Sequence, residues 1–80
     1  MTKKVALNQL CCGECARVIG LSADGSTRRR LQDIGLVPGT SVTCLQLSPL
    51  GDPVAYAIRG AVIALRCEDS GKVLVESEGR

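Results

Sequence analysis

Three of the five cysteines lie close together near the N-terminus. Cys12 and Cys15 have the C-x-x-C spacing that lets two thiolates reach one metal ion, and Cys11 adds a third sulfur. A closed tetrahedral site would still need Cys44 or Cys67, because the chain has no second C-x-x-C motif. The sequence leaves two interpretations open: a zinc, iron or thiol-handling site, or reduced cysteines without a ligand.

Two observations favour the interpretation without a ligand. Cys44 alternates with Val42 in an apolar stretch, where a thiol serves as a small core side chain. In addition, only one C-x-x-C motif is present, and the remaining thiols do not complete an obvious site. We therefore expect no bound cofactor, and the only candidate ligands for zinc or iron are Cys11, Cys12 and Cys15.

The polar residues do not indicate catalysis. The chain has no histidine, and its single tyrosine and scattered serines have no neighbouring base that would activate a nucleophile. The acidic residues Glu14, Asp24, Asp33 and Asp52 fall in separate predicted loops and turns, so no carboxylate pair is expected. Asp52 is expected to accept a hydrogen bond from the local backbone of its turn. We predict that the protein is not an enzyme.

Three consecutive arginines fall in the first turn of a predicted helix. Cations at this end of a helix oppose its macrodipole, and each costs about 0.3 to 1 kcal/mol. Helix stability therefore does not explain the run, which is either a solvated face or a contact surface for a partner. Basic and apolar residues side by side are typical of interfaces. The predicted contact residues are Arg28, Arg29, Arg30, Leu31, Leu36 and Val37, with Arg30 the best single candidate.

Length and charge limit the classes of function. Eighty residues predict one domain, 1–80. Ten basic against eight acidic residues give a net charge of +2, and only one residue is aromatic, so nucleic acid is not an expected partner. No apolar run approaches the ~20 residues that cross a bilayer, and no signal peptide is evident. We expect a cytoplasmic protein with reduced cysteines and no direct membrane insertion.

The arginines are positioned by one short predicted helix. Ser26 or Thr27 can cap its start, and Gly35 can take the left-handed conformation that ends helices. Leu31 lies on its apolar face. Pro38-Gly39 then suits a type II turn, because proline presets φ at the second position and glycine accepts a positive φ at the third.

The rest of the chain shows short alternating stretches separated by glycine and proline turns. Leu7 and Leu10 are expected to pack over one open end, and 77–80 to form a loose tail. The predicted fold class is all-β, a small five-stranded barrel with one short inserted α-helix. The predicted strands are 16–21, 40–47, 54–59, 62–65 and 72–76.

The order of these signals resembles the FeoA family. The resemblance covers nearly the whole chain, but the segment 11–15 departs from it, because relatives usually have charged or small residues there. It therefore assigns no ligand role to the cysteines. The matching pieces, in chain order, are Leu7-Asn8-Gln9-Leu10, Gly13-Glu14, Arg30-Leu31, Gly35-Leu36-Val37-Pro38-Gly39, Pro49-Leu50-Gly51-Asp52-Pro53, and Arg59-Gly60 ahead of Ala64-Leu65-Arg66.

The resemblance implies an SH3-like barrel and a non-enzymatic accessory role in bacterial ferrous iron uptake. It implies a FeoB-type membrane transporter as partner, contacted through its cytosolic GTPase portion. Self-association through an exposed barrel edge is left open. The alternative function is a small cytosolic metal- or thiol-binding protein that uses Cys11, Cys12 and Cys15.

Overall fold

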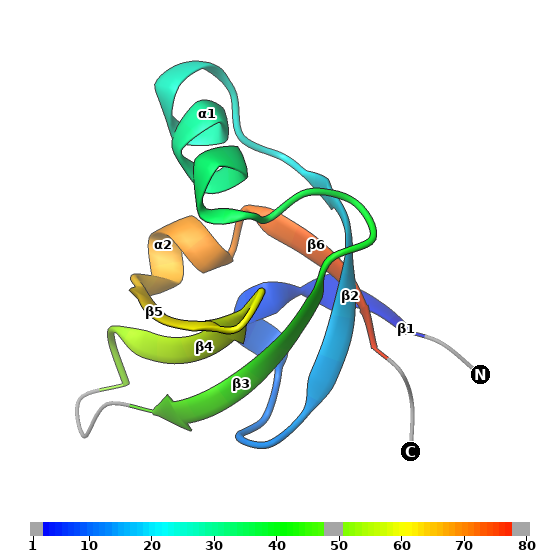
Figure 1. Ribbon diagram of the computed structural model, residues 1–80, viewed down its shortest axis with the longest axis vertical. Helices are drawn as coiled ribbons and strands as arrows, with labels where there is room; N and C mark the ends of the chain where they lie inside the picture. The colour runs from blue at the N-terminus through cyan, green and yellow to red at the C-terminus, as the bar shows by residue number, and fades with distance from the viewer. Residues whose placement is uncertain (1–2, 48–50, 78–80) are drawn as a thin grey trace.

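The computed structural model describes residues 3–47 and 51–77. Figure 1 shows the strands wrapped around a common centre, with the longer helix standing out at one end. The fold is therefore all-β, as predicted, and the described residues contain two short helical segments in addition to the predicted helix. The elements in chain order are β1 (Lys3–Ala6), a 3-10 helix η1 (Leu7–Gln9), β2 (Cys15–Leu21), α1 (Gly25–Ile34), β3 (Ser41–Leu47), β4 (Val54–Ile58), β5 (Ala61–Leu65), α2 (Cys67–Ser70) and β6 (Val73–Ser77).

The strands form one sheet in the order β1-β6-β2-β3-β4-β5, and every neighbouring pair is antiparallel. The five predicted strands are all present, with each end within one residue of its predicted position. The described residues contain a sixth strand, β1, which corrects the predicted count. Two of its four residues are lysines, so it lacks an apolar alternation, and its pairing with the distant β6 makes it a strand.

The predicted tail at 77–80 is corrected at its first residue. Ser77 ends β6 and pairs with Lys3 of β1 and Ala16 of β2, so it belongs to the sheet. Residues 78–80 lie outside the described residues, as does the part of the predicted 49–53 turn before Gly51.

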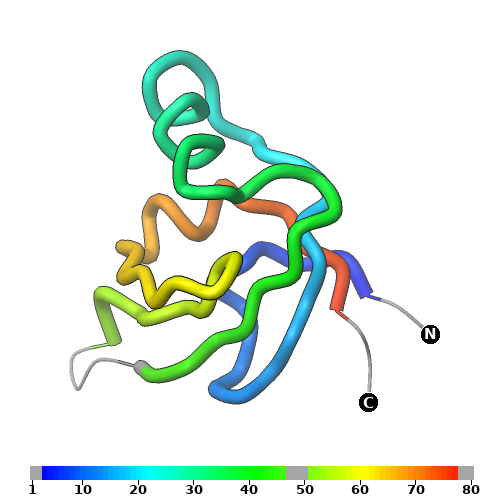
Figure 2. The backbone as a smooth tube through the Cα atoms, in the orientation of Figure 1, coloured from blue at the N-terminus to red at the C-terminus, as the bar shows by residue number. Residues whose placement is uncertain are grey.

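Helix α1 is an insertion between two paired strands. Figure 2 shows β2 leading into α1 and the chain returning from it to β3, the neighbour of β2 in the sheet. The helix begins at Gly25, after Asp24 in the N-cap position with extended backbone and no side-chain capping hydrogen bond, which corrects the predicted cap at Ser26 or Thr27. The three arginines therefore lie past its first turn rather than in it. It ends at Gly35 as predicted, with a φ of 115° that favours glycine.

The turn after α1 also agrees with the sequence. The Thr40 N–H donates to the Val37 carbonyl at 3.1 Å, which closes the turn around Pro38-Gly39. Gly39 has a φ of 96°, as a type II turn requires at this position. This turn directs the chain from the end of the helix into β3.

The core lies inside the curved sheet. Leu7 of η1 and Leu31 of α1 contribute buried side chains to it. Leu7 and Leu10 are buried in it, as is Cys44, which fills the core position predicted for it. The described core contains one large aromatic side chain, Tyr56 of β4, which is 1% exposed. The remaining buried apolar residues are Ala16, Val18, Ala23, Leu31, Leu36, Val42, Val54, Ile58, Leu65, Val73 and Val75.

Candidate functional site

The three arginines lie exposed on α1, which stands away from the sheet (Figure 1). The Arg28 guanidinium donates to the Leu21 carbonyl at 3.5 Å, a long contact at the end of β2. Arg29 lies beside a shallow hollow at the start of the helix, which Gly25 and Ser26 also line. In the folded chain, these two arginines are therefore accessible to a partner.

Arg30 has a partner inside the protein. Its guanidinium forms an ion pair with the Asp69 carboxylate of α2 at 2.9 Å. The Arg30 side chain is 60% exposed, so a pair of this kind contributes at most about 1 kcal/mol to stability. The contact ties α1 to α2, a structural role that the local sequence did not suggest. Arg30 is thus less suited than its two neighbours to be the leading contact residue.

Two of the apolar residues predicted for the contact surface are buried. Leu31 and Leu36 are both 0% exposed and belong to the core, where they fasten α1 and the chain after it to the barrel. They offer no surface to a partner, which corrects that part of the prediction. Val37 is half-buried and remains available. Of the predicted contact residues without an ion pair in the described part of the chain, those still accessible are Arg28, Arg29 and Val37, which we call the α1 surface.

The N-terminal cysteines lie against β3 rather than around a common centre. The Cys12 thiol donates to the Leu45 carbonyl at 2.9 Å, and the Cys15 sulfur lies 3.1 Å from the Thr43 hydroxyl. All five thiols are free. Within 3–47 and 51–77, no three Cys, His, Asp or Glu side chains are placed to hold a metal ion.

Glu14 organises the cysteine turn. One carboxylate oxygen accepts a hydrogen bond from the Cys11 backbone N–H at 2.9 Å, and the other accepts one from the Ser77 hydroxyl at 3.1 Å. The side chain therefore joins the turn to the end of β6. Its carboxylate thus has a structural role in holding the cysteine turn.

Asp52 also has a structural role. Its carboxylate accepts a hydrogen bond from the Cys67 backbone N–H at 2.8 Å, so it satisfies the start of α2. The hydrogen bond predicted within its own turn involves 49–53, part of which lies outside the described residues. The Cys67 thiol donates to the Gly51 carbonyl at 3.4 Å. Desolvation, and then the Asp52 carboxylate, raise the pKa of the Cys67 thiol.

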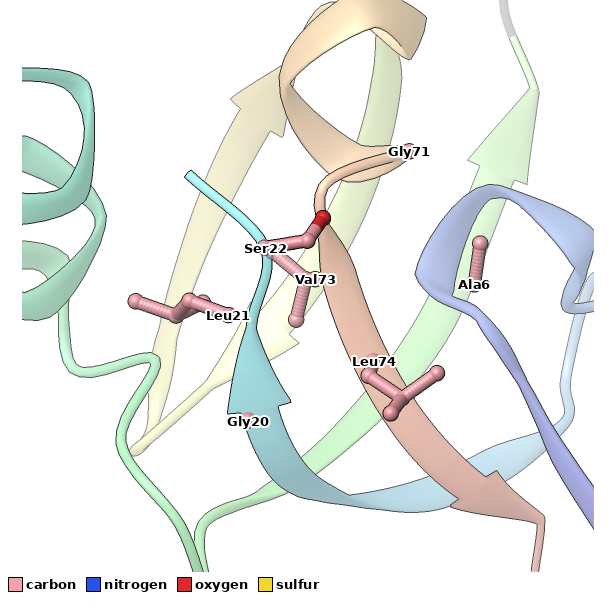
Figure 3. A pocket seen from close by; sticks show the side chains of 7 residues that line it. All are labelled: Ala6, Gly20, Leu21, Ser22, Gly71, Val73 and Leu74. Atoms are coloured by element: carbon pink, nitrogen blue, oxygen red, sulfur yellow. The ribbon is translucent and has the colours of Figure 1, made fainter. Parts of the chain in front are cut away.

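An apolar pocket of about 150 Å³ lies where β1, β2 and β6 meet, and sequence patterns did not reveal it. Figure 3 shows side chains from the end of β2 on one side and from β6 on the other. Leu74, which is 43% exposed, gives this pocket an apolar rim. The lining residues are Ala6, Gly20, Leu21, Ser22, Gly71, Val73 and Leu74.

The raised pKa values of two buried side chains, Cys44 and Tyr56, predict how the free energy of unfolding depends on pH. Burial raises the pKa of the Cys44 thiol, and the neighbouring Cys12, Cys11 and Glu14 raise it further. Burial likewise raises the pKa of the Tyr56 hydroxyl, against the opposing effect of a hydrogen bond with Ser70. Both groups therefore resist ionisation more strongly in the folded chain than in the unfolded chain.

We expect the free energy of unfolding to fall as the pH rises above about 9, where the unfolded Cys44 thiol begins to ionise. Below that pH the unfolded thiol is neutral and this contribution to stability is fully present. Urea unfolding of the parent and of Cys44→Ala at about pH 7 and about pH 10 measures the effect. The variant should lose less stability than the parent across this range, and equal losses would contradict the assignment to Cys44.

The chain matches known proteins over most of its length. A family model described as the FeoA domain matches residues 5–77. A fusion protein of Fe(2+) transport protein A and the Fe(2+) transporter FeoB from Porphyromonas gingivalis is 37% identical over 70 residues. The match covers 88% of this chain and 8% of the fusion protein, so the chain spans a small part of that relative. No described helix is long and apolar enough to span a membrane.

Solved structures show the same fold. A FeoA-like protein from Clostridium acetobutylicum has a TM-score of 0.90 and 34% identity, with 100% of this chain and 93% of that chain covered. The FeoA of Stenotrophomonas maltophilia in complex with zinc, an SH3 domain protein, has a TM-score of 0.77 and 28% identity, with 94% and 88% covered. The family model and these similarities confirm the resemblance and the SH3-like barrel, and the chain belongs to the FeoA family.

Proposed function

We propose that this chain is a non-enzymatic accessory module of ferrous iron uptake that binds the cytosolic GTPase portion of a FeoB-type transporter. The observation that carries the proposal is the Porphyromonas gingivalis relative, in which an Fe(2+) transport protein A is fused to FeoB. Fusion holds two modules at a high local concentration, which benefits modules that act on each other. When the module is a separate chain, it must instead bind its partner through a surface with sufficient affinity.

The α1 surface suits such an encounter. Its two arginines are exposed at the end of the barrel where α1 projects, so a partner can approach them without displacing the sheet. They lie at the fourth and fifth positions of α1, past its first turn, and an acidic surface on the partner would complement their charges. We place the interaction in the cytoplasm, where the GTPase portion of such a transporter lies, and it requires no bound cofactor.

The double variant Arg28→Glu/Arg29→Glu should bind the cytosolic portion of the transporter at least about tenfold more weakly than the parent, a loss of about 1.4 kcal/mol or more. The fold should remain intact, because both side chains are exposed. Calorimetric titration at two salt concentrations measures the effect, which should shrink as salt screens the charges.

The matched control is Lys3→Glu/Lys4→Glu, which makes the same change in net charge on the exposed strand β1. This control should bind like the parent. Equal weakening by the two double variants would show that net charge alone governs binding and would remove the α1 surface from the proposal. Failure of the parent chain to bind the transporter at all would overturn the proposed function itself.

A further inference from the structure

Within 3–47 and 51–77, strand β5 is an edge of the sheet, with only β4 as its neighbour. The two strands are joined by the two-residue turn Arg59-Gly60, and Ile58 pairs with Ala61 across it. In such a hairpin the residues that flank the turn exchange hydrogen bonds, and the pairs alternate from there. The N–H and C=O groups of Val62 and Ala64 therefore point away from β4, towards the free edge.

This edge lacks the features by which proteins usually protect a free strand. β5 contains no charged residue and no proline, and its register with β4 is unbroken by a bulge. Val62 is 71% exposed, the most exposed large apolar side chain among the described residues. The other edge of the sheet, β1, carries the exposed lysines Lys3 and Lys4 instead. The two edges thus differ, and only β5 combines free backbone groups with an apolar surface.

The charges next to β5 indicate what can pair with it. Arg59 precedes the strand in the hairpin turn and Arg66 follows it, and both are exposed. In the part of the chain that the structure describes, neither has an ion-pair partner. Two copies of β5 paired antiparallel about Ile63 would place Arg66 of each copy opposite Gly60 of the other, one position from its Arg59, so basic residues would gather at both ends. A strand with acidic ends would instead neutralise both arginines.

We propose that the β5 edge binds an extended segment of another protein by strand addition, with apolar residues at alternate positions and acidic residues at both ends. The backbone groups of Val62 and Ala64 supply the hydrogen bonds, and the Val62 side chain packs against an apolar residue of the added strand. Arg59 and Arg66 select the acidic ends. This inference stands apart from the transporter proposal, because it concerns a different surface and is tested with a synthetic ligand.

The probe is a fluorescent peptide in which Val alternates with Thr and Glu occupies both ends, compared with a peptide that has Lys in place of Glu. Fluorescence anisotropy should show that the Glu-ended peptide binds at least about tenfold more tightly than the Lys-ended one. Amide hydrogen exchange should show new protection at Val62 and Ala64 when this peptide is bound. In Arg59→Gln/Arg66→Gln the preference between the peptides should disappear.

Ala64→Pro tests the backbone contact directly. Proline removes the outward N–H of residue 64 but leaves the hydrogen bonds to β4, so the melting temperature should stay close to that of the parent. Binding of the Glu-ended peptide should weaken about tenfold or more. Val62→Lys, which keeps every backbone group, should also weaken binding of the Glu-ended peptide. This variant tests the proposal if Ala64→Pro does not fold.

Three results would overturn the proposal. The first is that neither peptide binds, and the second is that binding survives both Ala64→Pro and Val62→Lys. The third is a dimer in sedimentation equilibrium that Ala64→Pro dissociates, because the occupant of the edge would then be a second copy of the chain.

Discussion

Replacing Tyr56 by Ala should lower the free energy of unfolding by about 3 to 5 kcal/mol. The side chain is 1% exposed and is the largest of the fully buried ones. It projects from β4 between Cys44 of β3 and Ile63 of β5, its partners in register, so its removal opens a cavity shared by three strands. Small domains have about 5 to 15 kcal/mol of stability in total, so the loss should consume a large part of it.

Urea unfolding followed by far-ultraviolet circular dichroism measures this loss without relying on the tyrosine as a probe. The matched control is Tyr56→Phe, which keeps the ring and removes only the hydroxyl that hydrogen-bonds Ser70. The control should cost about 0.5 to 1.5 kcal/mol, plus the effect of leaving the buried Ser70 hydroxyl with one partner fewer. If Tyr56→Ala cost no more than the control, the ring would not be the centre of the core.

Local sequence patterns predicted most of the fold because strands, turns and helix ends in this chain are marked by short-range signals. Gly35 ends the helix and Pro38-Gly39 turns the chain, since both depend on backbone conformations that few residue types accept. Strand β1 gave no such signal. It is a strand because β6 pairs with it, and a pairing between the two ends of the chain leaves no periodic trace at Lys3 and Lys4.

The candidate site was predicted less well, because its decisive contacts join residues far apart in the sequence. The Arg30–Asp69 ion pair and the hydrogen bond from the Cys67 N–H to Asp52 both involve the short helix α2. No sequence pattern predicted this helix. The burial of Leu36 could have been anticipated, because a leucine directly after a helix-ending glycine often packs back on that helix. That Arg30 has a partner within the chain could not be predicted without the position of α2.

Replacing Leu31 by Ala should cost about 2 to 5 kcal/mol. The side chain is 0% exposed and is the buried residue of α1, so it carries most of the contact between that helix and the core. The Arg30–Asp69 pair lies on the surface and cannot replace it. The matched comparison is Arg30→Gln, which breaks the ion pair next door and should cost no more than about 1 kcal/mol. Thermal and urea unfolding of the two variants should therefore differ clearly.

Leu31→Ala and Arg28→Glu/Arg29→Glu together separate support of the α1 surface from direct contact with a partner. In Leu31→Ala the helix loses its anchor, so Arg28 and Arg29 are held less firmly, and binding to the transporter should weaken together with stability. In Arg28→Glu/Arg29→Glu binding should weaken while the melting temperature hardly changes. The two classes of variant should thus fall on different lines when binding is plotted against stability. If Leu31→Ala lost stability but bound like the parent below its melting temperature, α1 would not position the contact residues, and the transporter would have to bind another face of the barrel.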